Sequence, residues 1–248
     1  NLGRGFRAPT LFELYADGVH GGVAAVQRGD ASLDPETSLE ADASIRWFDD
    51  TTSFKLTAYR NRIDDYIALR GTGNTAGNGL PILRYGQVDA ELRGIELSMD
   101  HQLTDWLSVN AAAEMVDGER RDTGNDLPLL PSDNLRVGAD FTPAGHGWFS
   151  QPRMGIDVRY HASKDAAPDD PFAQFDNAPF GTASTDSYAL VDLNFGFSPT
   201  YRGQSFDVDV QVRNLFDEDY RGFLDTYKGY ALSPGRDIRL TLQVPFGG

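Results

Sequence analysis

The sequence predicts an all-β chain that forms a transmembrane antiparallel β-barrel. Apolar and polar residues alternate along nearly the whole chain, whereas the 3.6-residue period of helices is hard to find. Short and long connections between the alternating segments follow one another in strict turn. Several segments also reach the roughly 9–11 residues that a tilted strand needs to cross a bilayer. These three observations favour a membrane barrel over a soluble β-fold.

Seven segments show the alternation most clearly. Their apolar positions carry no charged residue, whereas half of the intervening positions are charged. This pattern is typical of strands whose two faces meet different surroundings. The segments are 39–47, 107–115, 135–141, 152–160, 189–197, 206–212 and 238–246.

Two further segments are predicted to be strands with an interruption. From Phe54 the apolar register runs to Ala58 and is then lost. Between Val88 and Met99 the apolar residues change parity at Arg93-Gly94. Because one extra residue restores the facing of a strand, we expect a β-bulge at Arg93-Gly94.

The connections fall into two classes of length. Tight turns are expected at 49–52, 102–105, 143–150 and 199–204, and long loops at 9–37, 70–82, 118–131, 164–185 and 217–233. One end of the sheet should therefore carry turns and the other large loops. Outer-membrane barrels have this asymmetry, with the long loops outside the cell.

Composition excludes several classes of protein. The chain has 248 residues, a net charge of −15 and no cysteine, which argues against a nucleic-acid partner, a disulfide scaffold and a Cys-ligated metal. It has no apolar run of about 18 residues, so we expect no transmembrane helix. It opens at Asn1 without a secretory signal, so we expect either a cytosolic protein or an internal piece of a longer one.

Four motifs in order resemble one family. GFRAPTLFELY stands at 5–15, LDPET at 33–37, NLFDEDY at 214–220 and GRDIRLTLQVPF at 235–246. Together they resemble the C-terminal part of the barrel of TonB-dependent outer-membrane receptors. The resemblance spans the whole chain.

The resemblance implies where the chain sits in a larger protein. Residues 1–248 would be the C-terminal portion of the barrel domain, with about nine to ten strands of a barrel of about 22. The plug domain, the TonB box and the N-terminal half of the barrel would be absent. The protein would lie in the outer membrane of a Gram-negative bacterium, and we expect this portion alone not to transport.

The resemblance also implies a function. A scarce nutrient, such as a metal ion, a ferric siderophore, haem or a similar chelate, would be taken up with energy from TonB, so we expect no enzyme and no resident cofactor. The partners would be TonB with ExbB and ExbD through the missing N-terminal region, the barrel-assembly machinery, and outer-membrane lipid and lipopolysaccharide. The alternatives are a passive porin or adhesin barrel, an outer-membrane hydrolase and a soluble β-sandwich binding module.

Candidate ligand-binding residues lie in the expected loops. His20, in YADGVHGG, resembles the loop histidine of the haem and zinc branches, with surroundings closer to the zinc-uptake branch. The alternative, which the residues alone favour, is a solvated loop residue. His161, followed by Asp165, Asp169 and Asp170, is a second candidate metal ligand or calcium site. The remaining candidates for ligand contact are Tyr15, Asp17, Tyr220, Asp225 and Tyr227.

Overall fold

The all-β prediction is confirmed by the computed structural model, which describes residues 1–167, 184–225, 227–229 and 231–244. Long strands dominate, and the one α-helix among the described residues has five residues. The elements are β1 (Leu2–Arg7), α1 (Leu11–Tyr15), β2 (Asp17–His20), η1 (Gly21–Val23), β3 (Ala25–Arg28), β4 (Glu36–Phe48), β5 (Thr52–Thr75), β6 (Pro81–Thr104), β7 (Leu107–Arg120), β8 (Asn134–Phe141), β9 (Arg153–His161), β10 (Tyr188–Phe197), β11 (Thr200–Tyr201), β12 (Gln204–Ser205), β13 (Asp207–Arg213) and β14 (Asp237–Gln243).

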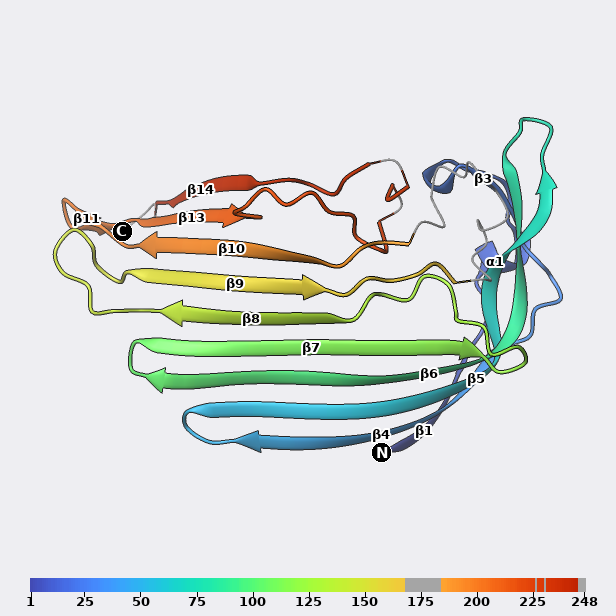
Figure 1. Cartoon of the computed structure of the whole chain (residues 1–248), viewed down its shortest axis with the longest axis horizontal. Helices are drawn as coiled ribbons and strands as arrows, with labels where there is room; N and C mark the ends of the chain where they lie inside the picture. Colours follow the sequence, from blue (N-terminus) through green and yellow to red (C-terminus); the bar gives the residue numbers. More distant parts are fainter. Residues whose placement is uncertain (168–183, 226, 230, 245–248) are drawn as a thin grey trace.

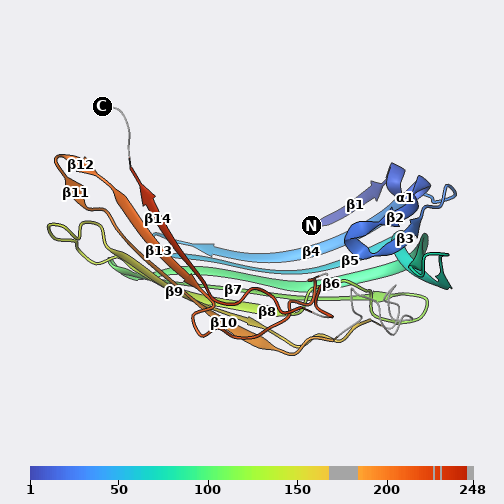
Figure 2. The same ribbon diagram turned by 90° about the horizontal axis from the view of Figure 1, so that it is seen from above.

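The strands form one antiparallel meander in sequence order. The path runs β1-β4-β5-β6-β7-β8-β9-β10-β13-β14, so each strand pairs with the next long strand along the chain (Figure 1). Seen from above, this sheet is a curved wall, and α1, β2 and β3 lie over its concave side at one end (Figure 2). We call this the loop end, and the opposite end, with the short connections, the turn end.

The strand registers place the predicted apolar positions on one face. Ile45 faces Leu56, Leu56 faces Leu97, and Leu97 faces Ala113 across four neighbouring strands. The band is exposed in the chain by itself, with Ile45 66% and Leu240 70% accessible. An apolar face of this extent requires an apolar partner, and a bilayer supplies one.

The opposite face of the wall is polar and joined by ion pairs. Arg136 contacts Asp157 at 2.7 Å, and Arg159 contacts Asp192 at 2.8 Å. These pairs bridge neighbouring strands, as cross-strand partners do in other sheets. The wall therefore separates one apolar face from one charged face, as the alternation predicts.

The predicted bulge at Arg93-Gly94 is wrong. β6 pairs with β7 without a shift there, and the irregularity lies on β5 between Ile63 and Tyr66, where Asp65 has a φ of 59°. The parity change instead marks a change in which face of β6 is buried. On the polar face, Leu92 pairs with Gly118 of β7, and the Leu130 side chain lies close to Gly118. The loop after β7 thus covers an apolar patch at the loop end.

The predicted loops are also corrected in two places. Residues 70–82 are mostly strand, because β5 and β6 stay paired out to Thr75 and Pro81. The loop 9–37 contains α1, β2, η1 and β3, and β3 pairs in parallel with β6 through Val26 and Ile82. The loop 164–185 lies partly outside the described residues.

Within the described part of the chain, no helix has the length and apolarity to cross a membrane.

Candidate functional site

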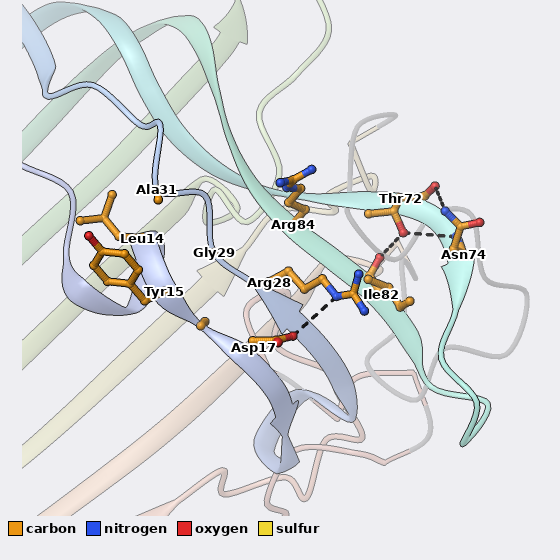
Figure 3. A pocket seen from close by; sticks show the side chains of 11 residues that line it. Leu14, Tyr15, Asp17, Arg28, Gly29, Ala31, Thr72, Asn74, Ile82 and Arg84 are labelled. Atoms are coloured by element: carbon orange, nitrogen blue, oxygen red, sulfur yellow. Dashed lines mark hydrogen bonds and ion pairs between the residues drawn. The ribbon is translucent and has the colours of Figure 1, made fainter.

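A cleft of about 900 Å³ opens at the loop end, between α1, the β2–β3 hairpin and the extended β5–β6 hairpin. Figure 3 shows Leu14 and Tyr15 on one side, Thr72 and Asn74 on the other, and Arg28 between them. We call it the outer cleft. It is lined by Leu14, Tyr15, Ala16, Asp17, Arg28, Gly29, Ala31, Thr72, Asn74, Ile82 and Arg84.

Local sequence places α1 at the rim of the outer cleft. Thr10 caps the helix, since its hydroxyl accepts from the backbone N–H of Glu13 while the Glu13 carboxylate accepts from the backbone N–H of Thr10. This reciprocal capping box satisfies two helix-end donors and fixes where the helix begins. Because α1 has five residues, it needs further support from the surrounding chain.

That support comes from a pair of charged residues. The Arg7 guanidinium donates to both carboxylate oxygens of Glu36 at 2.7 and 2.6 Å, and to Glu13 at 2.9 Å. Glu36 is 8% exposed and also accepts from the backbone N–H of Ile67 at 2.7 Å. One buried carboxylate therefore links β1, β4 and β5, and through Arg7 it also links α1.

Gly29 allows α1 and the end of β3 to approach closely. The Gly29 N–H donates to the Ala16 carbonyl at 2.6 Å. A Cβ at position 29 would lie 2.5 Å from the backbone of Leu14 and Tyr15, too close for any side chain. This backbone contact brings Tyr15 and Arg28 to the same cleft.

The electrostatics of the outer cleft are set by two arginines. Arg28 Nε lies 3.7 Å from Asp17 and Arg84 Nε lies 3.8 Å from Asp30, and both arginine side chains are more than half exposed. These separations are too long for direct hydrogen bonds. Arg28 and Arg84 are also register partners on β3 and β6, so both arginines enter the outer cleft from neighbouring backbone positions.

Asp30 is held away from full pairing with Arg84. Its carboxylate accepts from the Ser32 hydroxyl at 2.5 Å and from the Ser32 backbone N–H at 2.9 Å. These bonds, the hydroxyl first, lower the pKa of Asp30, with a smaller contribution from Arg84. The Asp30 carboxylate is therefore charged and hydrogen-bonded to Ser32, and the Arg84 guanidinium can still bind an added anion.

The β5 side of the outer cleft contributes neutral polar groups. The Thr72 hydroxyl donates to the Ile82 carbonyl at 2.7 Å, and the Asn74 side-chain amide donates to the Thr72 carbonyl at 3.1 Å. These bonds orient the two side chains along the strand. Together with the arginines, they suit a ligand rich in oxygen acceptors.

The sequence of the chain matches a known family of β-barrels. The model described as TonB dependent receptor-like, beta-barrel matches residues 1–215. The chain belongs to this family. The recognition made from the four motifs is thereby confirmed.

Curated TonB-dependent receptors align with nearly the whole chain. A vitamin B12 transporter BtuB from Photobacterium profundum is 26% identical over 89% of this chain and 31% of its own length. A heme/hemopexin utilization protein C from Haemophilus influenzae is 24% identical over 97% of this chain and 35% of its own. The chain thus spans about a third of the length of these relatives.

Solved structures of TonB-dependent receptors share the fold. A copper transporter OprC superposes with a TM-score of 0.75 at 19% identity, covering 99% of this chain and 35% of OprC. The siderophore receptor PirA from Acinetobacter baumannii gives 0.67 at 21% identity, covering 99% of this chain and 38% of PirA. The family is one of Gram-negative outer-membrane proteins, which confirms the predicted location and explains the apolar face.

The TonB-dependent receptor fold brings some of the predicted residues together. Tyr15 and Asp17 line the outer cleft. His20, at the end of β2, lies outside the cleft lining, with its ring 6.2 Å from that of Phe12 in an edge-on arrangement. Its role as a metal ligand stays a prediction.

His161 and Tyr220 belong to a second group of side chains. Tyr188 stacks on His161 with ring centroids 4.8 Å apart, and the ring centroid of Tyr220 lies 4.6 Å from that of Tyr188. The strand register pairs His161 with Tyr188 directly. The sequence analysis missed Tyr188, although its position at the start of an alternating segment is a usable signal.

Asp225 and Tyr227 lie in the last loop, where Asp225 organises the backbone. Its carboxylate accepts from the Tyr227 N–H at 2.9 Å and from the Ser233 hydroxyl at 3.3 Å. Asp225 therefore has a structural role in this loop. Contact of Asp225 or Tyr227 with a ligand stays a prediction.

The described residues contain no group of three or more His, Asp or Glu side chains positioned to hold a metal ion. Of the acidic residues considered beside His161, Asp169 and Asp170 lie outside the described residues. The sequence analysis also missed Arg28 and Arg84, because their juxtaposition depends on the parallel pairing of β3 with β6. No local pattern signals such a pairing.

Proposed function

We propose that this chain is part of an outer-membrane receptor that captures a scarce nutrient as an anionic or oxygen-rich chelate in the outer cleft, for uptake driven by TonB. The observation that carries the proposal is the adjacent pair Arg28 and Arg84, half-exposed and only loosely paired, in a cleft of about 900 Å³. Guanidiniums bind carboxylates and similar oxygen acceptors in a planar, two-point manner. Ring side chains such as Tyr15 add a flat apolar surface.

The chemistry of the outer cleft favours a chelate over a bare metal ion. Its charged groups are two arginines and Asp17, and cations repel a metal ion while attracting a chelator's acidic groups. The names of the relatives point to vitamin B12, haem and hemopexin, siderophores and copper as the cargo of those proteins. Three of these four are large chelates, which supports the same class here.

No covalent step is needed for this function. Loop residues would bind the chelate, the polar face of the wall would line its route, and TonB with ExbB and ExbD would act through the N-terminal part of the receptor. The barrel-assembly machinery would insert the protein beside lipopolysaccharide. A passive porin or adhesin is the rival function, and it would lack the plug domain and any dependence on TonB.

The test uses the intact receptor with the double variant Arg28→Gln, Arg84→Gln. Binding of haem, a ferric catecholate siderophore and cobalamin is measured by titration calorimetry, and TonB-dependent uptake is measured in cells. We expect the affinity for the bound chelate to fall at least about 100-fold, since each of the two charge-assisted hydrogen bonds contributes about 1.5–3 kcal/mol.

Arg121→Gln is the matched control. Arg121 is also a loop-end arginine, but its partners are Asp64 at 2.8 Å and Asp89 at 3.1 Å, and it does not line the outer cleft. Unchanged affinity in the double variant, or an equal loss in the control, would rule out capture by the two arginines. Uptake that persists without TonB would favour the porin.

A further inference from the structure

The strands at the loop end form a small sheet with two different faces. β3 pairs with β2 on one side and with β6 on the other, and β6 stays paired with β5 out to Thr75. We call these paired parts of β2, β3, β6 and β5 the outer sheet (Figure 1). One of its faces is closed by apolar side chains, because Ala25 and Leu83 are 0% exposed and Leu69 packs against them.

The opposite face of the outer sheet carries one row of charged side chains that crosses all four strands. Asp17 on β2 faces Arg28 on β3. Arg28 faces Arg84 on β6, and Arg84 faces Arg70 on β5. Paired positions lie on the same face of a sheet, so the row has an acidic residue at its β2 end and an arginine at its β5 end.

The arginine at the β5 end, Arg70, has the least compensated charge in the row. Each of the other two arginines has an aspartate carboxylate within 3.8 Å of its Nε. Arg70 is exposed, and none of the ion pairs among the described residues includes it. Its stem lies over Gly86, where an added Cβ would be 3.5 Å from the Arg70 Cδ. The guanidinium can therefore pair with a carboxylate outside the chain.

The edge of the outer sheet beside Arg70 is open, because β4 ends before reaching it. β4 begins at Glu36 and pairs with β5 only up to Asp64. The preceding chain crosses the face of the sheet, where the Gln87 side chain accepts from the Asp34 N–H at 3.0 Å and donates to the Asp34 carbonyl at 2.8 Å. In the part of the chain that the structure describes, no strand pairs with this side of β5 beyond Asp64.

The open edge presents backbone groups that a further strand could use. The Ile67 N–H points to this side, where the Glu36 carboxylate accepts from it at 2.7 Å. Because a strand has a period of two residues, the N–H groups of Leu69 and Gly71 point the same way. Neither has a backbone acceptor on that side among the described residues. Gly71 also has no side chain to keep another chain at a distance.

We propose that an extended segment of a separate polypeptide, arriving from outside the cell, adds to the open edge of β5 as a further strand and places an acidic side chain opposite Arg70. Strand addition to an exposed edge is a general mode of peptide recognition, in which main-chain hydrogen bonds give affinity and side chains give specificity. The acidic side chain would end the row at β5 as Asp17 ends it at β2.

The charges along the edge also limit which segment fits. Glu36 and Asp64 lie at the end of the edge nearest the wall, so the added segment should be neutral there and acidic only opposite Arg70. The inference rests on the outer-membrane location of the family. It is independent of which nutrient the outer cleft binds, because Arg70 does not line that cleft.

The test uses the intact receptor in nanodiscs and fluorescently labelled, threonine-rich peptides that differ only at one central residue. That residue is glutamate, glutamine or lysine, and binding is followed by fluorescence anisotropy. We expect the glutamate peptide to bind up to about fivefold more tightly than the glutamine peptide, which is the size of an opposite-charge cross-strand pair. The lysine peptide should bind most weakly.

Methylation of the peptide backbone tests strand addition itself. Methyl groups on alternate amide nitrogens remove the donors from one edge of the peptide and leave its side chains unchanged. One set of alternate nitrogens would face β5 and the other set would face away. We therefore expect one methylated glutamate peptide to lose binding and the other to retain it, whereas a peptide held by charge alone would bind equally in both forms.

Arg70→Glu reverses the charge at the edge. We expect this variant to bind the lysine peptide more tightly than the glutamate peptide, the reverse of the wild-type order. Gly71→Pro removes one N–H from the open side of β5, where proline is compatible with an edge strand, and it should weaken all three peptides. Arg221→Glu is the matched control, since Arg221 is also an exposed arginine but belongs to the last loop; it should keep the wild-type order.

Several outcomes would overturn the proposal. A wild-type receptor that binds none of the peptides would show that another part of the receptor covers the edge. Equal binding of the three peptides, equal binding of the two methylated peptides, or a reversed order in Arg221→Glu would show that charge alone attracts them. Chelate affinity is measured in parallel, so that a failure of the open edge and a failure of the outer cleft are told apart.

Discussion

The wall and the loop end of this molecule are built from different kinds of contact. From β7 to β14 every long strand pairs with its neighbour along the chain, in a register that repeats the same alternation of faces. At the loop end, contacts join segments far apart in sequence, such as β3 with β6 and Arg7 with Glu36. The wall is repetitive, whereas the loop end depends on a few individual side chains.

This difference predicts how each region responds to substitution. An exposed ion pair such as Arg136 with Asp157 is one of many similar contacts, and such pairs contribute about 0–1 kcal/mol each. Glu36, by contrast, is a buried carboxylate that serves three strands at once. The outer cleft therefore depends on residues that do not line it.

The largest effect is expected for Glu36→Ala. The change removes the acceptor of two Arg7 bonds and of the Ile67 N–H, so a backbone donor loses its partner and Arg7 keeps Glu13 alone as an acceptor. Breaking a buried pair costs about 3–5 kcal/mol, so we expect that much loss of local stability and the detachment of α1. Hydrogen exchange of the intact receptor should show the loss in residues 10–30 and leave β8 to β10 unchanged.

Arg136→Ala in the wall is the comparison for Glu36→Ala. It should lower stability by no more than about 1 kcal/mol and leave the exchange of residues 10–30 unchanged. If the two variants lose protection equally, the contrast between the wall and the loop end does not hold.

Gly29→Ala is expected to have an intermediate effect. The new methyl group would lie 2.5 Å from the backbone of Leu14 and Tyr15, so α1 must move away from β3. Overpacking of this kind costs about 1–3 kcal/mol, and it should widen the outer cleft. The measurement is chelate affinity together with thermal unfolding.

Gly77→Ala is the matched control for Gly29→Ala. Gly77 lies between β5 and β6, and a Cβ there meets nothing within 4 Å. Neutral behaviour at position 77 with a loss at position 29 would confirm that close backbone approach is the cause. Wild-type affinity in Gly29→Ala would contradict it.

The contrast between the wall and the loop end also explains which elements could be predicted from the sequence. Alternation predicted the long strands of the wall and their order, because period-two patterns are local. The alternation also predicted a bulge at Arg93-Gly94, whereas the structure has its bulge at Asp64 and Asp65. A change of parity in the sequence does not distinguish an inserted residue from a change in which face of the strand is buried. Residues 70–82, rich in Gly, Thr and Asn, were predicted to be a loop, but pairing between β5 and β6 makes them strand.

The motifs predicted the family because their residues build the structure. Arg7 and Glu36 tie the loop end together. Asn214, 3% exposed with a φ of 49°, accepts from the Glu218 N–H at 2.8 Å and closes the turn after β13. The cleft arginines Arg28 and Arg84 belong to no motif, and only a contact between distant strands brings them together.

The smallest effect concerns the turn end, where Asp49 organises the tight turn between β4 and β5. Its carboxylate accepts from the backbone N–H of Thr51 and Thr52, from the Thr51 hydroxyl and from Trp47 Nε1. These bonds, first among them that from the Thr51 N–H, lower the pKa of Asp49 from 3.8 to about 2.

The direction of the pH dependence follows from this shift. A carboxyl with a lowered pKa in the folded state stabilises that state fully above its unfolded pKa, and the stabilisation is lost as the pH falls through the folded pKa. We therefore expect the turn to hold at pH 5 and to loosen between about pH 4 and pH 2, as followed by the carboxyl resonance of Asp49 in NMR. Asp49→Asn should remove this pH dependence while leaving the outer cleft unchanged, since the turn and the cleft lie at opposite ends of the wall. An Asp49 carboxyl resonance in the wild type that titrates near pH 4 would show that the turn does not stabilise the charged form.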